Sequence, residues 1–185
     1  MIILDNKTGG LTMARIELSA EQRDDIRDVW SRLPGIGEGW LSLSDAIYTK
    51  SALPARLREC ARMRIAQINQ CQMCLGVRFE SLTAEGIDAD MYDHVADYAT
   101  WPGYSEPERM ATEFAERFCL DHLSMDDAFW ARMHAAFSDD EILELGVSVA
   151  TWVGQGRLTQ VLGLDVSCGL GHAGADGKLE QAAPR

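Results

Sequence analysis

The chain has 185 residues, 46% of them hydrophobic, and a formal net charge of −12 at pH 7. This length and this apolar fraction are sufficient for one domain with a sizeable buried core. A surface with so many more acidic than basic residues offers no positive stripe that could follow phosphates or anionic lipid headgroups. The composition therefore argues against nucleic acid and against a membrane surface as partners.

The cysteine content and the apolar segments favour a cytoplasmic location. The number of cysteines is odd, and a chain of this apolar content does not need disulfides to hold its core together. The most apolar segment, residues 142–164, is interrupted by Glu144, Gln155 and Arg157, which argues against a membrane span. Residues 1–18 lack the basic start and the long apolar run of a secretory signal, so we expect a flexible N-terminal extension.

The predicted elements are all helical. Capping boxes, in which a serine caps a helix and a Glu or Gln three residues later reaches back, begin at Ser19, Ser105 and Ser138. Pro54 suits the first turn of a helix. Apolar residues recur at helical spacing between these marks, and no segment alternates convincingly with period two. In chain order the predicted helices span residues 19–32, 40–50, 54–69, 71–85, 88–100, 105–122, 125–136 and 139–162.

These elements predict an all-α bundle of about seven to eight helices in a single domain, residues 19–164. The helix from Asp139 is apolar around most of its circumference, which predicts burial on several sides, either in the centre of the bundle or at a subunit interface. An interface there would make the protein a homo-oligomer. Residues 165–185 are rich in glycine and lack periodicity, so we expect a mobile tail.

The pair Cys71 and Cys74 carries the clearest chemical signal. On a helix that begins after the sequence INQ, positions 71, 74, 75, 78 and 82 share one stripe, because steps of three and four residues return to the same face. Cysteines in the first turn meet the positive end of the helix dipole, and Arg78 would add a cation one turn past Cys74. Both effects favour the nucleophilic thiolate, so the pair is a candidate redox site.

Other interpretations of the cysteines stay open on these residues alone. Small residues on an apolar stripe are often only packing. A closed zinc site requires four Cys or His ligands, and no second ligand pair is present, so no metal is expected. Cys60, Cys119 and Cys168 have no partner in the sequence, and Cys119 extends a predicted apolar stripe. The four histidines (His94, His122, His134 and His172) are dispersed, which favours surface positions.

Glu59 lies twelve residues before Cys71 and has two readings. It is either one member of a solvated charge ladder with Arg56 and Arg62, or a proton acceptor near the thiols. The second role requires the two helices to form a tight hairpin around residues 69–70.

The combination of these residues resembles a known family. Glu59, eleven residues and then Cys71-Gln72-Met73-Cys74 are similar to the core motif of the alkylhydroperoxidase D-like (AhpD-like) proteins of the carboxymuconolactone decarboxylase superfamily. The flanking sequences RMRIAQINQCQMCL, AEGID and FSDDEILELGVSVATWVGQGRLTQ are similar as well. The resemblance covers about residues 53–164, and the spaced glutamate with the CxxC pair is far more specific than a CxxC pair alone.

The resemblance implies an AhpD-like all-α fold, assembly into trimers or larger oligomers such as hexamers, and thiol peroxidase or disulfide reductase activity without a cofactor or metal. In such proteins the cysteine matching Cys74 attacks the peroxide, and the one matching Cys71 resolves the sulfenic acid into a disulfide. The reductant is a lipoylated or thioredoxin-like partner, and a peroxiredoxin can be the next acceptor. Residues Cys74, Cys71, Glu59 and Arg78 are therefore the predicted catalytic set.

Two positions depart from the family pattern. Arg78 stands where the family has a histidine that relays protons between the glutamate and the thiols, and Met73 replaces a histidine found between the cysteines of the best-known members. Neither side chain can shuttle protons. Arg78 can still stabilise the Cys74 thiolate, pair with Glu59 or bind an anionic substrate group.

The sequence thus predicts a thiol-dependent hydroperoxide reductase or dithiol–disulfide oxidoreductase with an antioxidant role. Two alternatives remain. In a decarboxylase of carboxylated lactones, Arg78 would hold the substrate carboxylate, although that chemistry has no use for a dithiol. The second alternative is a non-catalytic oligomeric scaffold that has kept the fold after losing the proton-relay histidine.

Overall fold

The computed structural model describes residues 13–78 and 85–168 and the backbone of residues 180–181. These residues are mostly helical, which confirms the predicted all-α class. The α-helices are α1 (Ala20–Asp24), α2 (Arg27–Trp30), α3 (Ile36–Thr49), α4 (Ala55–Asn69), α5 (Gln72–Gly76), α6 (Ala89–Asp93), α7 (Glu106–Leu120), α8 (Asp127–Ala136) and α9 (Asp139–Val161). Two 3-10 helices, η2 (Val95–Asp97) and η3 (His122–Ser124), and two strands, β1 (Val77–Arg78) and β2 (Glu180–Gln181), complete the described elements.

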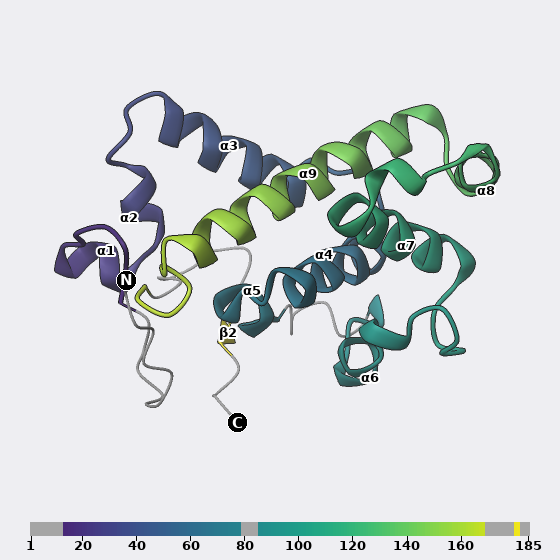
Figure 1. Ribbon diagram of the computed structural model, residues 1–185, viewed down its shortest axis with the longest axis horizontal. Helices are drawn as coiled ribbons and strands as arrows, with labels where there is room; N and C mark the ends of the chain where they lie inside the picture. The colour runs from purple at the N-terminus through teal and green to yellow at the C-terminus, as the bar shows by residue number, and fades with distance from the viewer. Residues whose placement is uncertain (1–12, 79–84, 169–179, 182–185) are drawn as a thin grey trace, which may run out of the picture.

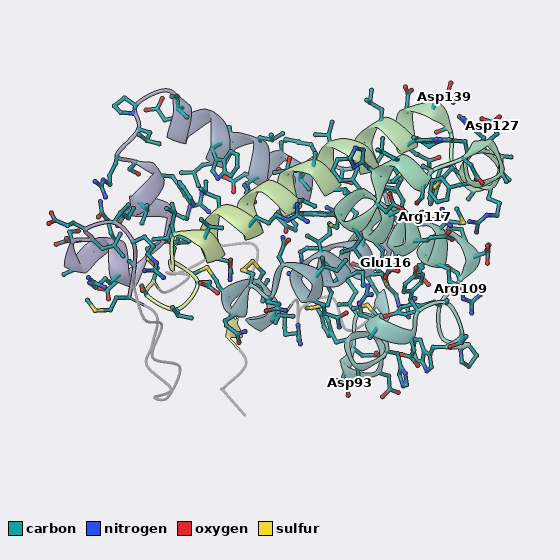
Figure 2. All side chains as sticks on the ribbon, viewed as in Figure 1. Asp93, Arg109, Glu116, Arg117, Asp127 and Asp139 are labelled. Carbon is teal, nitrogen blue, oxygen red and sulfur yellow. A yellow bond between two sulfur atoms is a disulfide. The ribbon has the colours of Figure 1, made fainter. Side chains whose placement is uncertain are left out.

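Helix α4 lies at the centre of the bundle and packs along both α7 and α9. Helix α9 runs along the length of the molecule, with α7 and α8 towards one end and α1 and α2 towards the other (Figure 1). The charged residues Asp127 and Asp139 lie at the α8 end, well away from α5 along the long axis (Figure 2). The middle of the molecule is therefore where α4, α5 and α9 can bring side chains together.

The two sides of α4 contact different parts of the core. One side, with Leu57, Ala61 and Ile65, joins the main hydrophobic cluster with residues of α7, α8 and α9. The other side, with Cys60, Met63 and Ala66, packs against α6, η2 and Tyr104. Burying both sides stabilises α4 by removing apolar surface from water, and it leaves the polar residues of α4 buried as well.

Where helix starts carry strong local signals, prediction and structure agree closely. Helix α4 begins one residue after the predicted start and ends at the predicted Asn69. Helix α9 begins at the predicted Asp139, because Ser138 and Glu141 form the predicted capping box. A second such box is present at Ser105, before α7.

Two predicted helices are divided, and a third begins earlier than predicted. The predicted helix 19–32 is two helices, α1 and α2, because the backbone at Asp25 is extended (φ −136°, ψ 118°). The predicted helix 88–100 is divided into α6 and η2 at His94. The predicted helix 40–50 begins earlier, after Gly35, whose φ of 77° suits a residue without a side chain.

The prediction of a helix over residues 71–85 is wrong in its described part. Helix α5 ends at Gly76, and Val77 is extended (φ −71°, ψ 123°). Val77 and Arg78 form β1, which pairs antiparallel with β2, although no strand was predicted. Residues 79–84 of the predicted helix lie outside the described residues.

Parts of the tail from residue 165, which is predicted to be mobile, are described and make contacts. The Asp165 carboxylate accepts a hydrogen bond from the backbone of Gln72, and the Cys168 amide donates to the carbonyl of Leu164. The backbone of residues 180–181 pairs with β1. These contacts bring the chain after α9 to both ends of α5. Residues 1–12, 169–179 and 182–185 lie outside the described residues.

In the part of the chain that the structure describes, no helix combines the length and the apolar character needed to cross a membrane.

Candidate functional site

The turn between α4 and α5 is the tight hairpin that a role for Glu59 requires. Gln70 adopts the left-handed conformation (φ 55°), and the Cys71 amide donates to the carbonyl of Ala66. The side chain of Asn69 accepts a hydrogen bond from Arg157 of α9 at 3.0 Å. A side chain at Gly156 would place its Cβ 2.7 Å from the Asn69 amide nitrogen. Helix α9 thus approaches the turn closely and fixes the direction in which α5 leaves it.

Cys71 and Cys74 form a disulfide at the start of α5. Cys71 is the N-cap residue, and its sulfur accepts a hydrogen bond from the Cys74 amide at 3.2 Å. The backbone N–H of Gln72 donates to the Asp165 carboxylate at 3.1 Å, so a second acceptor caps the same helix end. Cys71 is 0% exposed, whereas Cys74 is partly exposed. Cys74 is therefore the residue of the pair that is partly open to solvent.

Glu59 and Arg62 form a buried, two-pronged ion pair on α4. The Nε and NH2 groups of Arg62 donate to the two carboxylate oxygens of Glu59 at 2.7 and 2.5 Å. The two residues are only 3% and 5% exposed. Burial acts to lower the pKa of Arg62, but attraction by the Glu59 carboxylate outweighs it and raises this pKa well above its usual range. Arg62 is therefore permanently charged, and Glu59 is not part of a solvated ladder.

Arg62 also connects this ion pair to α5. Its remaining N–H groups donate to the carbonyl of Cys74 at 2.8 Å and to the carbonyl of Val77 at 3.0 Å. Carbonyls at the end of a helix have no partner within the helix, and here a buried guanidinium supplies one. Glu59 thus holds Arg62, and Arg62 holds the main chain of the reactive cysteine.

Tyr92 and Arg78 complete the network. The Tyr92 hydroxyl donates to Glu59 Oε1 at 2.7 Å. The Arg78 guanidinium lies 4.0 Å from the centre of the Tyr92 ring, in the geometry of a cation–π contact, and donates to the carbonyl of Leu75 at 2.7 Å. Burial lowers the pKa of Arg78, although a guanidinium remains protonated at neutral pH. Two arginines therefore bind the C-terminal end of α5.

The structure corrects the predicted position of Arg78. It does not lie on the cysteine helix one turn past Cys74, because α5 has already ended and Arg78 lies in β1. The carboxylate of Glu59 is bonded to Arg62 and Tyr92, so the predicted pairing of Arg78 with Glu59 is not observed among these contacts. Arg78 acts on the site through the Tyr92 ring and the backbone of α5.

Sequence reasoning missed three residues of the site, namely Arg62, Tyr92 and Asp165. Arg62 follows Glu59 at a spacing of three, which indicates an ion pair but not its burial. Tyr92 and Asp165 lie on other elements, and nothing in their local sequence distinguishes them. Of the predicted set, Glu59, Cys71 and Cys74 are brought together through Arg62, and Arg78 reaches the same network from β1.

The remaining sequence candidates lie outside this network. Cys60 is fully buried, and burial raises its pKa to about 12, so it stays a thiol at neutral pH. Burial also raises the pKa values of Cys119 and Cys168. His94 stacks on Trp101 with ring centres 4.6 Å apart. His172 lies outside the described residues, and within them no group of three or more His, Cys, Asp or Glu is arranged to hold a metal ion.

The chain is similar to known proteins in both sequence and fold. Residues 34–117 match the carboxymuconolactone decarboxylase family. The uncharacterized protein YnjA of Escherichia coli (strain K12) is 30% identical over 122 residues. That match covers 63% of this chain and 64% of YnjA, so the chain spans less than two thirds of this relative's length.

Two solved structures share the fold at low sequence identity. The first is a protein of unknown function from Agrobacterium tumefaciens, named as a candidate antioxidant defence protein AhpD, with a TM-score of 0.62 and 17% identity over 73% of this chain and 92% of that one. The second is the debrominase Bmp8 in complex with 2,3,4-tribromopyrrole, with a TM-score of 0.62 and 15% identity over 81% of this chain and 73% of that one. One fold thus occurs in proteins with different described roles, so function has to be argued from the site.

Proposed function

We propose that the chain is an AhpD-like member of the carboxymuconolactone decarboxylase superfamily and that Cys71 and Cys74 are a redox-active pair that reduces hydroperoxides or disulfides. The observation that carries the proposal is the disulfide at the start of α5, whose Cys74 is clamped through its carbonyl to the buried Glu59–Arg62 pair. A pair that only filled space in the core would not need a charged group holding its main chain. The similarity to AhpD-type proteins supports the same chemistry.

The reaction begins with the reduced pair. The Cys74 thiolate attacks the outer oxygen of a hydroperoxide, an S–O bond forms, and the O–O bond breaks. The alkoxide leaves and takes up a proton to become an alcohol. The Cys71 thiol then attacks the sulfenic sulfur, an S–S bond forms, and water leaves. A dithiol reductant returns both cysteines to thiols and is itself oxidised to a disulfide.

Cys74 is the attacking residue in this scheme because it is the partly exposed cysteine, whereas Cys71 is buried. Cys71 lies at the helix N-terminus, where its sulfur already accepts the Cys74 N–H. Cys74 lies in the first turn of the same helix, where the unpaired N–H groups carry partial positive charge that favours its thiolate. The geometry thus supports Cys74 as the cysteine that contacts the substrate and Cys71 as the buried cysteine that resolves the sulfenic acid.

The proton for the leaving alkoxide comes from water in this proposal. Both oxygens of Glu59 accept hydrogen bonds from the Arg62 guanidinium, and Oε1 also accepts one from the Tyr92 hydroxyl, so the carboxylate serves to hold Arg62. Arg78 cannot deliver a proton at neutral pH. We therefore assign Glu59 and Arg62 to positioning of α5, and we expect slower peroxide turnover than with a relay histidine.

The proposal also includes the electron donor, the cellular location and the oligomeric state of the enzyme. The electron donor is a lipoylated or thioredoxin-like protein in the cytoplasm, with a peroxiredoxin as a further acceptor, and the protein acts as a homo-oligomer such as a trimer or hexamer. No metal or organic cofactor enters the scheme. A lactone decarboxylase is the weaker alternative, because a dithiol has no role in that reaction.

A redox titration of wild type, Cys71→Ser and Cys74→Ser tests the proposal, with the disulfide measured by intact mass. Peroxide consumption is then followed with dihydrolipoamide as the reductant. Cys168→Ser is the matched control, since this thiol is also partly exposed but lies outside the pair. We expect reversible loss of two hydrogens in wild type and in the control, and no such loss in either variant of the pair.

The two measurements separate the possible results. Peroxide loss that requires Cys74 supports the peroxidase, and a cycling disulfide with no peroxide loss restricts the function to dithiol–disulfide exchange. A wild-type protein whose pair never cycles would contradict both forms of the proposal.

A further inference from the structure

The chain leaves α9 through a turn that directs Asp165 towards the cysteine pair. Gly163 adopts the left-handed conformation (φ 67°), and the amide of Leu164 donates to the carbonyl of Thr159. These are the features of a Schellman turn, which ends a helix. Leu164 is 0% exposed and packs against the start of α2, so the turn is anchored in the core. Asp165 is thereby held beside the first residue of α5 (Figure 1).

Asp165 and Cys71 accept hydrogen bonds from the same turn of α5. The backbone N–H of Gln72 donates to the Asp165 carboxylate at 3.1 Å, and the backbone N–H of Cys74 donates to the Cys71 sulfur at 3.2 Å. Gln72 and Cys74 are the first and third residues of α5, so the two acceptors lie over one helical turn. Asp165 is also partly buried. A carboxylate is thus fixed at the helix end that carries both sulfurs.

The other charged groups that face the pair or α5 come from several neighbouring elements. They are Glu59 and Arg62 of α4, Arg78 of β1, Arg157 of α9 and Arg23 of α1. Glu59 and Arg62 neutralise each other, and Arg78 binds the opposite end of α5. No ion pair among the described residues includes Asp165. The charge of Asp165 is therefore not cancelled by an ion pair at the end of α5 that carries the sulfurs.

A fixed negative charge beside a dithiol has a definite effect on its chemistry. It disfavours the charged form of a nearby thiol, so it raises the pKa of that thiol. The N–H groups of the first turn act in the opposite direction, but the Gln72 N–H is already occupied by Asp165. Stabilised thiolates make a disulfide a stronger oxidant, because they stabilise the reduced form. A charge that opposes the thiolates therefore favours the disulfide and makes the reduced pair a stronger reductant.

We propose that Asp165 sets the redox balance of the pair, because its charge disfavours thiolates at Cys71 and Cys74 and so favours their disulfide. Asp165 is a positioning residue, since it acts on the cysteines through α5 and through its charge and takes no part in the bond changes. The inference rests on the proposed function in assigning a redox role to the pair. It also narrows that function, because a pair with a low potential and few thiolates at neutral pH suits dithiol–disulfide exchange better than rapid attack on peroxide.

Asp165→Asn tests the charge directly, because asparagine keeps an acceptor for the Gln72 N–H and removes the charge. The pKa of the Cys74 thiol is measured in the reduced protein from the pH dependence of its alkylation by iodoacetamide, with the alkylated residue identified by peptide mass. We expect this pKa to be about one unit lower in the variant than in the wild type. Asp165→Ala removes the acceptor as well as the charge and should lower the pKa by a similar amount.

The equilibrium between the pair and dithiothreitol provides a second readout, in which dithiothreitol loses two hydrogens and the disulfide gains them. At a pH above the thiol pKa values, Asp165→Asn should shift this equilibrium towards the reduced pair about tenfold, or about 30 mV, for each thiol that ionises. The shift should disappear at pH 6, where the thiols are protonated in both proteins, and a merely structural effect would not follow pH in this way. Asp126→Asn is the matched control, because Asp126 caps α8 at the Phe129 N–H, and it should match the wild type in both measurements.

Two results would overturn the inference. One is a folded Asp165→Asn protein whose thiol pKa and potential equal those of the wild type. The other is a shift in Asp165→Ala without a shift in Asp165→Asn, which would assign the effect to the hydrogen bond and not to the charge. The alkylation measurement needs neither peroxide nor a protein partner. A lowered thiol pKa in a protein whose pair never cycles would therefore support the role of Asp165 and count against the proposed function alone.

Discussion

Helices α9 and α5 are stabilised in opposite ways. Helix α9 has 23 residues, begins with a complete capping box and buries Leu145, Val149 and Trp152 among other side chains. Helix α5 has five residues, none of them buried. Its N-terminus is capped by Cys71 and Asp165, and its C-terminal carbonyls are bound by Arg62 and Arg78. Such a short helix is not stable by itself in water, so polar contacts from other elements determine its geometry.

Because of this difference, α9 should determine the stability of the fold and α5 the reactivity of the disulfide. Changes in the packing of α9 should weaken the whole fold and leave the disulfide as it is while the protein remains folded. Changes in the contacts of α5 should alter how the disulfide reacts, even where they cost less stability. Three variants test this separation, and a fourth changes an ion pair outside both helices; they are taken in order of the expected effect.

Glu59→Gln should have the largest effect. It leaves the Arg62 charge buried without a counter-charge, which costs about 3–5 kcal/mol in the free energy of unfolding. Urea unfolding measures this loss, and the disulfide of the folded variant should be reduced faster by dithiothreitol. Glu106→Gln is the control, because Glu106 is exposed and lies 3.8 Å from its arginine partner, so its effect should be within about 0.5 kcal/mol. Equal stabilities of the two variants would argue against an essential buried pair.

Leu145→Ala should destabilise the fold by about 2–5 kcal/mol, because a fully buried side chain leaves a cavity. The rate at which dithiothreitol reduces the disulfide of the folded protein should stay at the wild-type value. Leu143→Ala, at an exposed position of the same helix, controls for helix propensity. A changed reduction rate in Leu145→Ala would show that α9 and α5 are not separable.

Tyr92→Phe should cost about 1.5–3 kcal/mol, since it removes a hydrogen bond to a charged carboxylate and keeps the ring under Arg78. It should also change the rate of disulfide reduction, because the Glu59 carboxylate then keeps its hydrogen bonds from Arg62 and loses the one from Tyr92. Tyr104→Phe loses a hydrogen bond to the carbonyl of Met91, outside the network, and should leave that rate unchanged. The comparison is made by stopped-flow kinetics and by urea unfolding, and equal kinetics would exclude Tyr92 from the site.

The smallest effect concerns pH. A hydrogen bond from Arg132 lowers the pKa of Glu113, which stabilises the fold above the ordinary value of 4.5 and is lost as the pH falls through the lowered pKa. Because the pair is partly exposed to solvent, we expect less than about 1 kcal/mol. Glu113→Gln should therefore be less stable than wild type at pH 7, and the difference should shrink at low pH. A difference that does not depend on pH would contradict an ionic origin.

The sequence predicted the elements whose signals are local. The start of α9 follows from the Ser138 capping box. The start of α4 follows from Pro54. A turn after α4 was predicted from the sequence, but the left-handed conformation of Gln70 in that turn was not. The helix over residues 71–85 was predicted because its apolar stripe continued, yet the chain becomes extended at Val77. Contacts with Arg62 and β2, both distant in sequence, outweigh the local preference there.

The sequence by itself determined the all-α class, the cysteine pair and the glutamate twelve residues before it, because residue types and short spacings carry that information. Only the tertiary structure decided which arginine serves the glutamate. Arg62 and Arg78 are equally charged in the sequence, and burial distinguishes them. The hairpin at Gln70 folds α5 back over α4, so the carbonyls of Cys74 and Val77 meet Arg62, while the end of α5 at Gly76 carries Arg78 away to the Tyr92 ring. Packing excludes water from the Glu59–Arg62 pair, whereas charged residues on a helix surface stay solvated. This exclusion of water depends on the tertiary structure and is not encoded in the local sequence.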